Sequence, residues 1–166
     1  ASVPPVAVPA EKPSGPGLRI LSTTFPILFQ DQGRKGHTGM GVSTSGALDM
    51  GCLRRANRAV GNPPNVPALE ITLGPVRVKA EEKMVVALTG AAMASVDGVT
   101  IPMGTAFALD AGDVVSIVPT GSGVRSYLAL RGGYDVAKIL GSAATDTLAN
   151  IGPRAVTAGT VLAQAR

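Results

Sequence analysis

Short runs of apolar and β-branched residues, separated by turn sequences, recur along most of the chain. In residues 76–80, valines alternate with Arg77 and Lys79, which places one face of the run against a core and the other in water. Asp97-Gly98 separates two other runs and favours a two-residue hairpin turn. Strands are predicted at residues 18–23, 27–29, 68–73, 76–80, 84–88, 94–96, 99–101, 105–109, 113–118 and 124–130. Their regular spacing favours a barrel or a sandwich over alternating strands and helices.

Two segments have helical spacing instead. In residues 47–60, apolar side chains recur at intervals of three and four, with Ser45 as the expected N-cap and Gly61 as the stop. Asp49 would then lie in the first turn, where the helix dipole favours a carboxylate. A second, shorter helix is expected at residues 136–140. The whole pattern predicts a mainly β domain with one or two short helices.

The N-terminal residues have a different composition. Residues 1–17 contain five prolines among small residues. Such a segment buries too little apolar surface to offset the entropy lost on ordering, so it is interpreted as a tail or linker. The folded domain is expected at residues 18–166, a length that one hydrophobic core can serve.

Composition narrows the possible environments of the protein. The longest apolar runs are far shorter than the roughly 20 residues that a membrane-spanning helix needs. No charged leader precedes an apolar stretch at the N-terminus, so a cytoplasmic location without membrane contact is expected. One cysteine and one histidine leave too few ligands for a structural zinc site, and no metal is expected.

The net charge of +4 restricts the class of partner. A basic balance is the first sign of a nucleic-acid-binding protein, but here the basic residues are scattered and aromatics make up only 3% of the chain. Too few side chains are available to stack on bases. The charge fits a small anionic substrate better than nucleic acid.

Residues 30–41 gather polar side chains between four glycines. Glycine permits backbone conformations that bring amide N–H groups close to an anion, but neither of the common glycine-rich nucleotide-binding patterns is present. A tight connection between a strand and the following helix explains the segment as well. His37 in this segment could exchange protons near neutral pH, or it could simply be solvated.

Polar side chains inside apolar elements are further candidates. Asn57, on the predicted helix, is expected to pin a neighbouring backbone segment. Glu70 shares a strand face with Thr72, and it must be paired or functional if that face is buried. Arg125 and Tyr127 also share a strand face. They either offer a cation and a phenol to an anionic ligand or are two exposed strand residues.

Several motifs, taken together and in order, resemble a known family. They are Gln30-Asp31-x-Gly33-Arg34-x-Gly36, Gly41-Val42-x-x-Ser45-Gly46-Ala47-Leu48-Asp49, Ala56-Asn57-x-x-Val60-Gly61-Asn62, Leu69-Glu70-Ile71, Leu88-Thr89-Gly90-Ala91, Arg125-x-Tyr127-Leu128-Ala129 and Leu140-Gly141-Ser142-x-x-Thr145-Asp146. The chain resembles the N-terminal half, subdomains A and B, of the biotin-dependent carboxyltransferase family. This family includes the 5-oxoprolinase C subunit, the KipA-like proteins and proteins labelled allophanate hydrolase subunit 2.

The resemblance implies a cyclophilin-like closed β-barrel and a KipI-like first subunit as partner. It implies a subunit or fragment of an ATP-dependent 5-oxoprolinase or biotin-dependent carboxyltransferase assembly that acts on a small amide or lactam. The chain itself is expected to bind no cofactor, because ATP or carboxybiotin would act at the level of the assembly. The alternatives are a urea carboxylase or allophanate hydrolase component, and a non-enzymatic KipA-like regulatory binding module.

Chemistry and resemblance together select six residues. Asp31, Arg34 and Asp49 are expected to be catalytic, and the substrate-binding residues are expected to be Asn57, Arg125 and Tyr127. The carboxylates would orient or deprotonate an amide nitrogen, and the arginines would hold the charge of a carboxylate or of carboxybiotin. No nucleophile–base pair, metal set or nucleotide loop is complete in the sequence, so the isolated chain is expected to be inactive.

Overall fold

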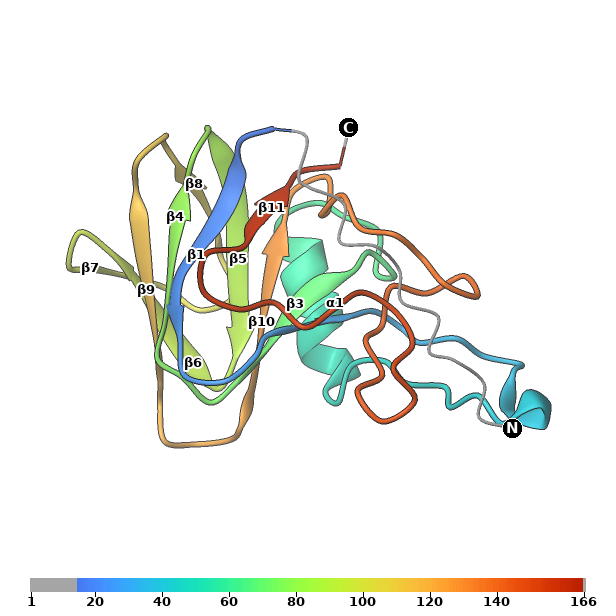
Figure 1. Ribbon diagram of the computed structural model, residues 1–166. Helices are drawn as coiled ribbons and strands as arrows, with labels where there is room; N and C mark the ends of the chain where they lie inside the picture. Colours follow the sequence, from blue (N-terminus) through green and yellow to red (C-terminus); the bar gives the residue numbers. More distant parts are fainter. Residues whose placement is uncertain (1–14, 166) are drawn as a thin grey trace.

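The computed structural model describes residues 15–165, which form a mainly β structure with one α-helix in that range. Its elements are β1 (Gly17–Thr23), β2 (Leu28–Gln30), the 3-10 turn η1 (Thr38–Met40), α1 (Met50–Ala59), β3 (Ala68–Thr72), β4 (Val76–Ala80), β5 (Met84–Gly90), β6 (Ala92–Val96), β7 (Val99–Ile101), β8 (Ala106–Leu109), β9 (Val114–Pro119), β10 (Arg125–Leu130) and β11 (Val161–Ala163). The strands form two antiparallel sheets, of order β11-β1-β4-β9-β6-β7 and β2-β3-β10-β5-β8 (Figure 1).

The main apolar core joins side chains from both sheets. Ile20 and Val78 of the six-stranded sheet and Leu69 and Leu128 of the five-stranded sheet belong to one buried cluster. In β4 the valines are buried and Arg77 is exposed, as the alternating pattern predicts. The turn between β6 and β7 is also as predicted, since Asp97 and Gly98 both adopt positive φ, of 49° and 80°.

Helix α1 packs on the face of the five-stranded sheet that points away from this core (Figure 1). Tyr127 and Ala129 of β10 pack with Leu53 and Ala56 of the helix. Successive strand residues point to opposite faces, so Leu128, between them, faces the main core. The helix therefore creates a second, smaller core, and it positions its own N-terminus over the ends of β5 and β10.

The start of α1 differs from the prediction. The N-cap is Asp49, whose side chain accepts a hydrogen bond from Cys52 N at 2.8 Å, and it is not Ser45. Ser45 has a φ of 52°, and its hydroxyl donates to Asp146 instead, so the chain before residue 49 is held in a non-helical path. The predicted end is confirmed, because Gly61 follows the helix with a φ of 79°.

The helix predicted at residues 136–140 is wrong. The backbone makes a tight turn there, in which Ile139 and Ser142 exchange hydrogen bonds and Leu140 and Gly141 adopt positive φ. The preceding Asp135 N donates to Ala163 O. Five residues are too few to nucleate a helix when other segments bind their backbone groups.

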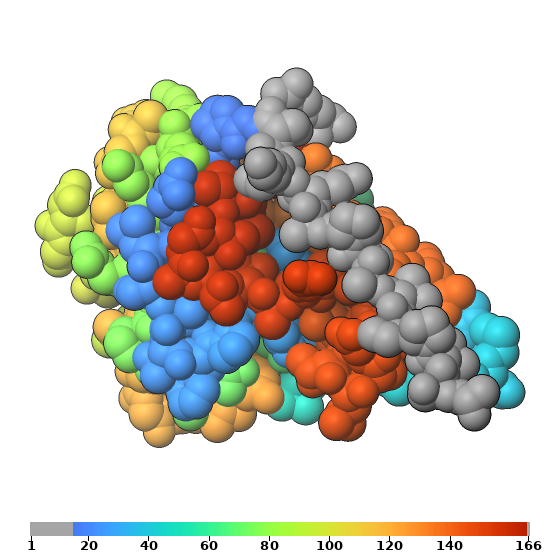
Figure 2. Space-filling view, in the orientation of Figure 1, coloured from blue at the N-terminus to red at the C-terminus, as the bar shows by residue number. Residues whose placement is uncertain are grey.

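The C-terminal strand β11 was not predicted, and it pairs with β1. In the space-filling view the C-terminal residues, in red, lie against the blue N-terminal strand (Figure 2). Strand β1 begins at Gly17, one residue before the predicted domain boundary. Residues 1–14 of the predicted tail lie outside the described residues.

The closed barrel is not confirmed, because the described strands pair as two separate sheets and not as one ring. Within residues 15–165, no helix is long and apolar enough to cross a membrane.

Candidate functional site

A cavity of about 500 Å³ lies where the N-terminus of α1 meets the ends of β5 and β10. We call it the α1 cavity. Its charged lining residues are Asp49, Arg55 and Arg125. Gly90 and Gly123 bring backbone close to the same space. The segments that form this wall are distant in sequence, so the fold alone assembles it.

A buried hydrogen-bond network lies directly behind this cavity. The Tyr127 hydroxyl donates to Glu70 Oε2 at 2.6 Å and accepts from Asp49 N at 2.8 Å. Leu48 N donates to the same carboxylate oxygen at 3.0 Å. Tyr127 is fully buried and Glu70 is 5% exposed, so these bonds are shielded from water. The network ties β3 and β10 to the backbone that leads into α1.

Arg125 completes this arrangement. Its Nε atom lies 3.3 Å from Glu70 Oε1, which is an ion-pair distance. The N–H is not aimed at that oxygen, so Nε has no hydrogen-bond acceptor among the described residues. Arg125 and Tyr127 therefore share a face, as predicted, but they are not two exposed strand residues. Both contact Glu70.

The pKa shifts of Asp49, Cys52 and Tyr127 keep each of these groups in one protonation state near neutral pH. The side-chain and backbone hydrogen bonds from Cys52 lower the pKa of Asp49, so its carboxylate is ionised. Burial raises the pKa of the Cys52 thiol, and burial followed by the hydrogen bond to Glu70 raises the pKa of Tyr127. Thiol and phenol thus keep their protons. The cavity offers a carboxylate and guanidinium groups, without an activated thiolate nucleophile.

Asp31 belongs to a different cluster, between the loop that follows β2 and residues 139–146. Its Oδ1 accepts from Gly33 N at 2.8 Å and from the Ser142 hydroxyl at 2.6 Å, and its Oδ2 accepts from Ala143 N at 2.8 Å. Each oxygen of this buried carboxylate has a donor within the protein. Asp31 therefore fixes the path of two loops.

Arg34 joins the same two loops and is only 2% exposed. Its guanidinium donates to the carbonyl oxygens of Ala144 and, at 3.5 Å, Ile139, while Nη1 has no partner among the described residues. Its backbone N–H donates to Thr44 O. These contacts favour a tight connection over an anion cradle in residues 30–41. Sequence reasoning missed this burial, because the accepting carbonyls are more than a hundred positions away.

Asn57 lies toward the C-terminal end of α1, outside the lining of the α1 cavity. Its Nδ2 donates to Val66 O at 2.8 Å, and its Oδ1 accepts from Asn62 Nδ2 at 3.1 Å. The expectation that its amide pins a neighbouring segment is confirmed. The structure thus brings Asp49, Arg125 and Tyr127 together, and it adds Glu70, whose charge inside an apolar strand was the signal for it.

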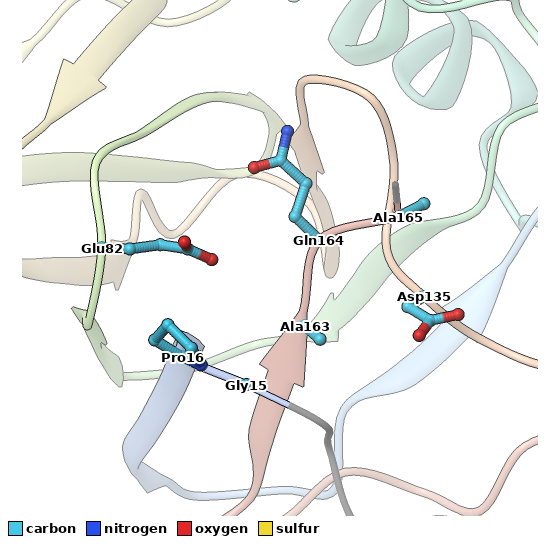
Figure 3. A pocket seen from close by; sticks show the side chains of 7 residues that line it. All are labelled: Gly15, Pro16, Glu82, Asp135, Ala163, Gln164 and Ala165. Carbon is cyan, nitrogen blue, oxygen red and sulfur yellow. The ribbon is translucent and has the colours of Figure 1, made fainter.

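A second cavity, of about 520 Å³, opens near residues 15–16 and 163–165. Figure 3 shows two of its lining residues, Glu82 and Asp135, on different segments of the chain. No cation lines it among the described residues, and within residues 15–165 no three His, Cys, Asp or Glu side chains gather as a metal site. The α1 cavity is therefore the candidate functional site.

Comparison with known proteins places the chain in a family. The family described as "Carboxyltransferase domain, subdomain A and B" matches residues 40–166. The chain is 43% identical over 136 residues to the 5-oxoprolinase C subunit of Escherichia coli, a match that covers 81% of this chain and 44% of that protein. It is also 43% identical over 121 residues to urea amidolyase of Saccharomyces cerevisiae, a match that covers 72% of this chain and 7% of that protein.

Solved structures agree with these matches. The crystal structure of TTHA0988 in space group P212121 superposes with a TM-score of 0.89 at 35% identity, over 99% of this chain and 35% of that one. The Kluyveromyces lactis urea carboxylase gives a TM-score of 0.85 at 34% identity, over 90% of this chain and 14% of that one. The chain spans less than half the length of the 5-oxoprolinase subunits that it matches. It belongs to the family of carboxyltransferase domains, subdomain A and B.

Proposed function

We propose that the chain is a component of a 5-oxoprolinase or biotin-dependent carboxyltransferase assembly that acts on a small amide or lactam, and that the α1 cavity receives this group. Family membership supports the class of reaction. The observation that carries the assignment to the cavity is the convergence of Asp49 and Arg125 on one space of about 500 Å³, with Tyr127 and Glu70 fixing both from behind.

This arrangement suits an amide chemically. An amide presents an N–H donor next to a carbonyl acceptor, and the cavity offers a carboxylate acceptor and a guanidinium donor. Asp49, ionised at neutral pH because its pKa is lowered, would accept the amide N–H and orient it. Arg125 would donate to the carbonyl oxygen and stabilise the charge that develops there.

We assign ATP or carboxybiotin to the other components of the assembly. Neither common glycine-rich nucleotide-binding pattern occurs in the sequence. Each cation that lines the α1 cavity also has a nearby carboxylate, which leaves no surplus positive charge for a triphosphate. The residues of this chain would therefore bind and orient the amide, and the partner, a KipI-like first subunit in this proposal, would complete the site.

A turnover screen tests the proposal. The chain, alone and together with its partner subunits, is assayed for ATP-dependent hydrolysis of 5-oxoproline and for carboxylation of urea with a biotinylated carrier. We expect turnover on one of the two substrates in the complete assembly, and none from the chain alone. Turnover by the isolated chain, or tight binding to a kinase domain without turnover in any assembly, would contradict the proposal.

A further inference from the structure

The lining of the α1 cavity contains two cations, and each faces a carboxylate. Arg55 lies on the first turns of α1 and acts electrostatically on Asp49, whose pKa it helps to lower. Arg125 lies beside Glu70, at 3.3 Å. The four formal charges therefore sum to zero, although the chain as a whole carries +4.

Of these four charged groups, Glu70 is the one that is buried from water and held by the protein itself. It is 5% exposed and accepts two hydrogen bonds, from the Tyr127 hydroxyl and from Leu48 N. Two donors on one of its oxygens hold this carboxylate in one position. The charge opposite Arg125 is thus a fixed part of the site, unlike a counter-ion drawn from solution.

This charge balance bears on which part of a substrate the cavity can accept. A ligand carboxylate at Arg125 would also approach the fixed charge of Glu70, and like charges at close range in a partly desolvated site repel strongly. A neutral amide suffers no such repulsion, and it can still accept from the guanidinium and donate to Asp49. Electrostatic complementarity of this kind selects by rejecting the wrong charge.

We propose that Glu70 is a specificity-determining residue, which neutralises Arg125 so that the α1 cavity takes the uncharged amide or lactam group and rejects a carboxylate. This inference rests on the proposed function and names the chemical class that this pocket holds. A carboxylate carried next to the amide or lactam group, as in 5-oxoproline, would be repelled by Glu70 and would weaken binding.

The test compares two probes that differ by one carboxylate, 2-pyrrolidinone and 5-oxoproline. Each is titrated into the full chain, and binding is followed by NMR at the backbone N–H signals of Gly90, Gly104 and Gly123, which line the cavity. In the wild type we expect 2-pyrrolidinone to bind more tightly than 5-oxoproline. Glu70→Gln keeps the size of the side chain and removes its charge. It should increase the affinity for 5-oxoproline, relative to that for 2-pyrrolidinone, by about tenfold.

Two further variants keep the test decisive. Glu82→Gln makes the same charge change in the second cavity and should leave the ratio of the two affinities unchanged. Arg125→Gln removes the cation, so it should strengthen the preference for 2-pyrrolidinone over 5-oxoproline. This variant tests the inference even if Glu70→Gln does not fold. A wild-type preference for 5-oxoproline, or equal ratios in Glu70→Gln and Glu82→Gln, would overturn the inference and leave the proposed function standing. Absence of binding by both probes would overturn the two together.

Discussion

Replacing Tyr127 by phenylalanine tests the network behind the cavity without creating a void. The substitution removes one hydroxyl, which donates to Glu70 and accepts from Asp49 N. A hydrogen bond to a charged group contributes about 1.5–3 kcal/mol, and a donor left without a partner costs about 1 kcal/mol more. We therefore expect Tyr127→Phe to lower the free energy of unfolding by about 3 kcal/mol.

Tyr134 offers a matched control, because it is also buried and its hydroxyl makes one hydrogen bond, to the neutral carbonyl of Leu128 at 3.1 Å. Its ring stacks edge-on against Phe29, a contact that phenylalanine keeps. Tyr134→Phe should cost about 1 kcal/mol. Urea denaturation of the two variants and the wild type measures the difference. Equal losses, or a larger loss for Tyr134→Phe, would refute the reasoning that Tyr127 bridges a buried charge and the start of α1.

Three other substitutions test separate features of the structure. Gly17→Ala places a methyl group directly against the Leu162 carbonyl, so it should lower the free energy of unfolding in a urea titration by about 2 kcal/mol. In the control Gly39→Ala, the added methyl group meets nothing within 4 Å, so this free energy should be nearly unchanged. Asn57→Ala should lower the thermal midpoint, because it loses the hydrogen bond to Val66 O, but it should leave probe binding in the NMR titration unchanged. Weaker probe binding by a folded Asn57→Ala variant would instead support the predicted role of Asn57 in substrate binding. The pKa of Asp146 is lowered from 3.8 in the folded protein, chiefly by the hydrogen bond from Ala149 N. The ionised carboxylate therefore stabilises the fold above pH 3.8. This stability is lost as the pH falls through the lowered pKa of the folded state. Thermal midpoints of Asp146→Asn should therefore fall less between pH 5 and pH 2 than those of the wild type, and parallel pH curves would contradict this.

Local patterns predicted most strands because each run carries its own signal. The β6–β7 hairpin is an example, since Asp97-Gly98 suits the positive φ values that the turn requires. Strand β11 has only three residues, and its partner β1 lies at the other end of the domain. Its formation depends on that pairing, which no local pattern reveals. The helix predicted at residues 136–140 fails for a local reason, because Ile139 and Ser142 exchange hydrogen bonds in a tight turn that replaces the helix.

In the candidate site, too, local sequence indicates single residues, whereas the contacts between them depend on tertiary pairing. Glu70 and Tyr127 could each be recognised as polar groups in apolar strands, but their contact depends on the pairing of β3 with β10, in which these two residues are direct cross-strand partners. Arg34 was predicted from a loop motif, yet its burial depends on carbonyls of residues 139 and 144. Residue type indicated which positions carry polar side chains inside apolar elements, and tertiary pairing decided which of these positions meet.

The effect of Arg125→Lys on kcat/KM in the complete assembly, with Arg54→Lys as control, tests most directly whether the α1 cavity binds the substrate. Lysine keeps the charge but loses the planar guanidinium that we assign to the amide carbonyl, whereas Arg54 is exposed on α1 and does not line the cavity. We expect Arg125→Lys to lower kcat/KM by about a hundredfold at an unchanged thermal midpoint, and Arg54→Lys to equal the wild type. An unchanged kcat/KM in Arg125→Lys would contradict the assignment of substrate binding to the α1 cavity.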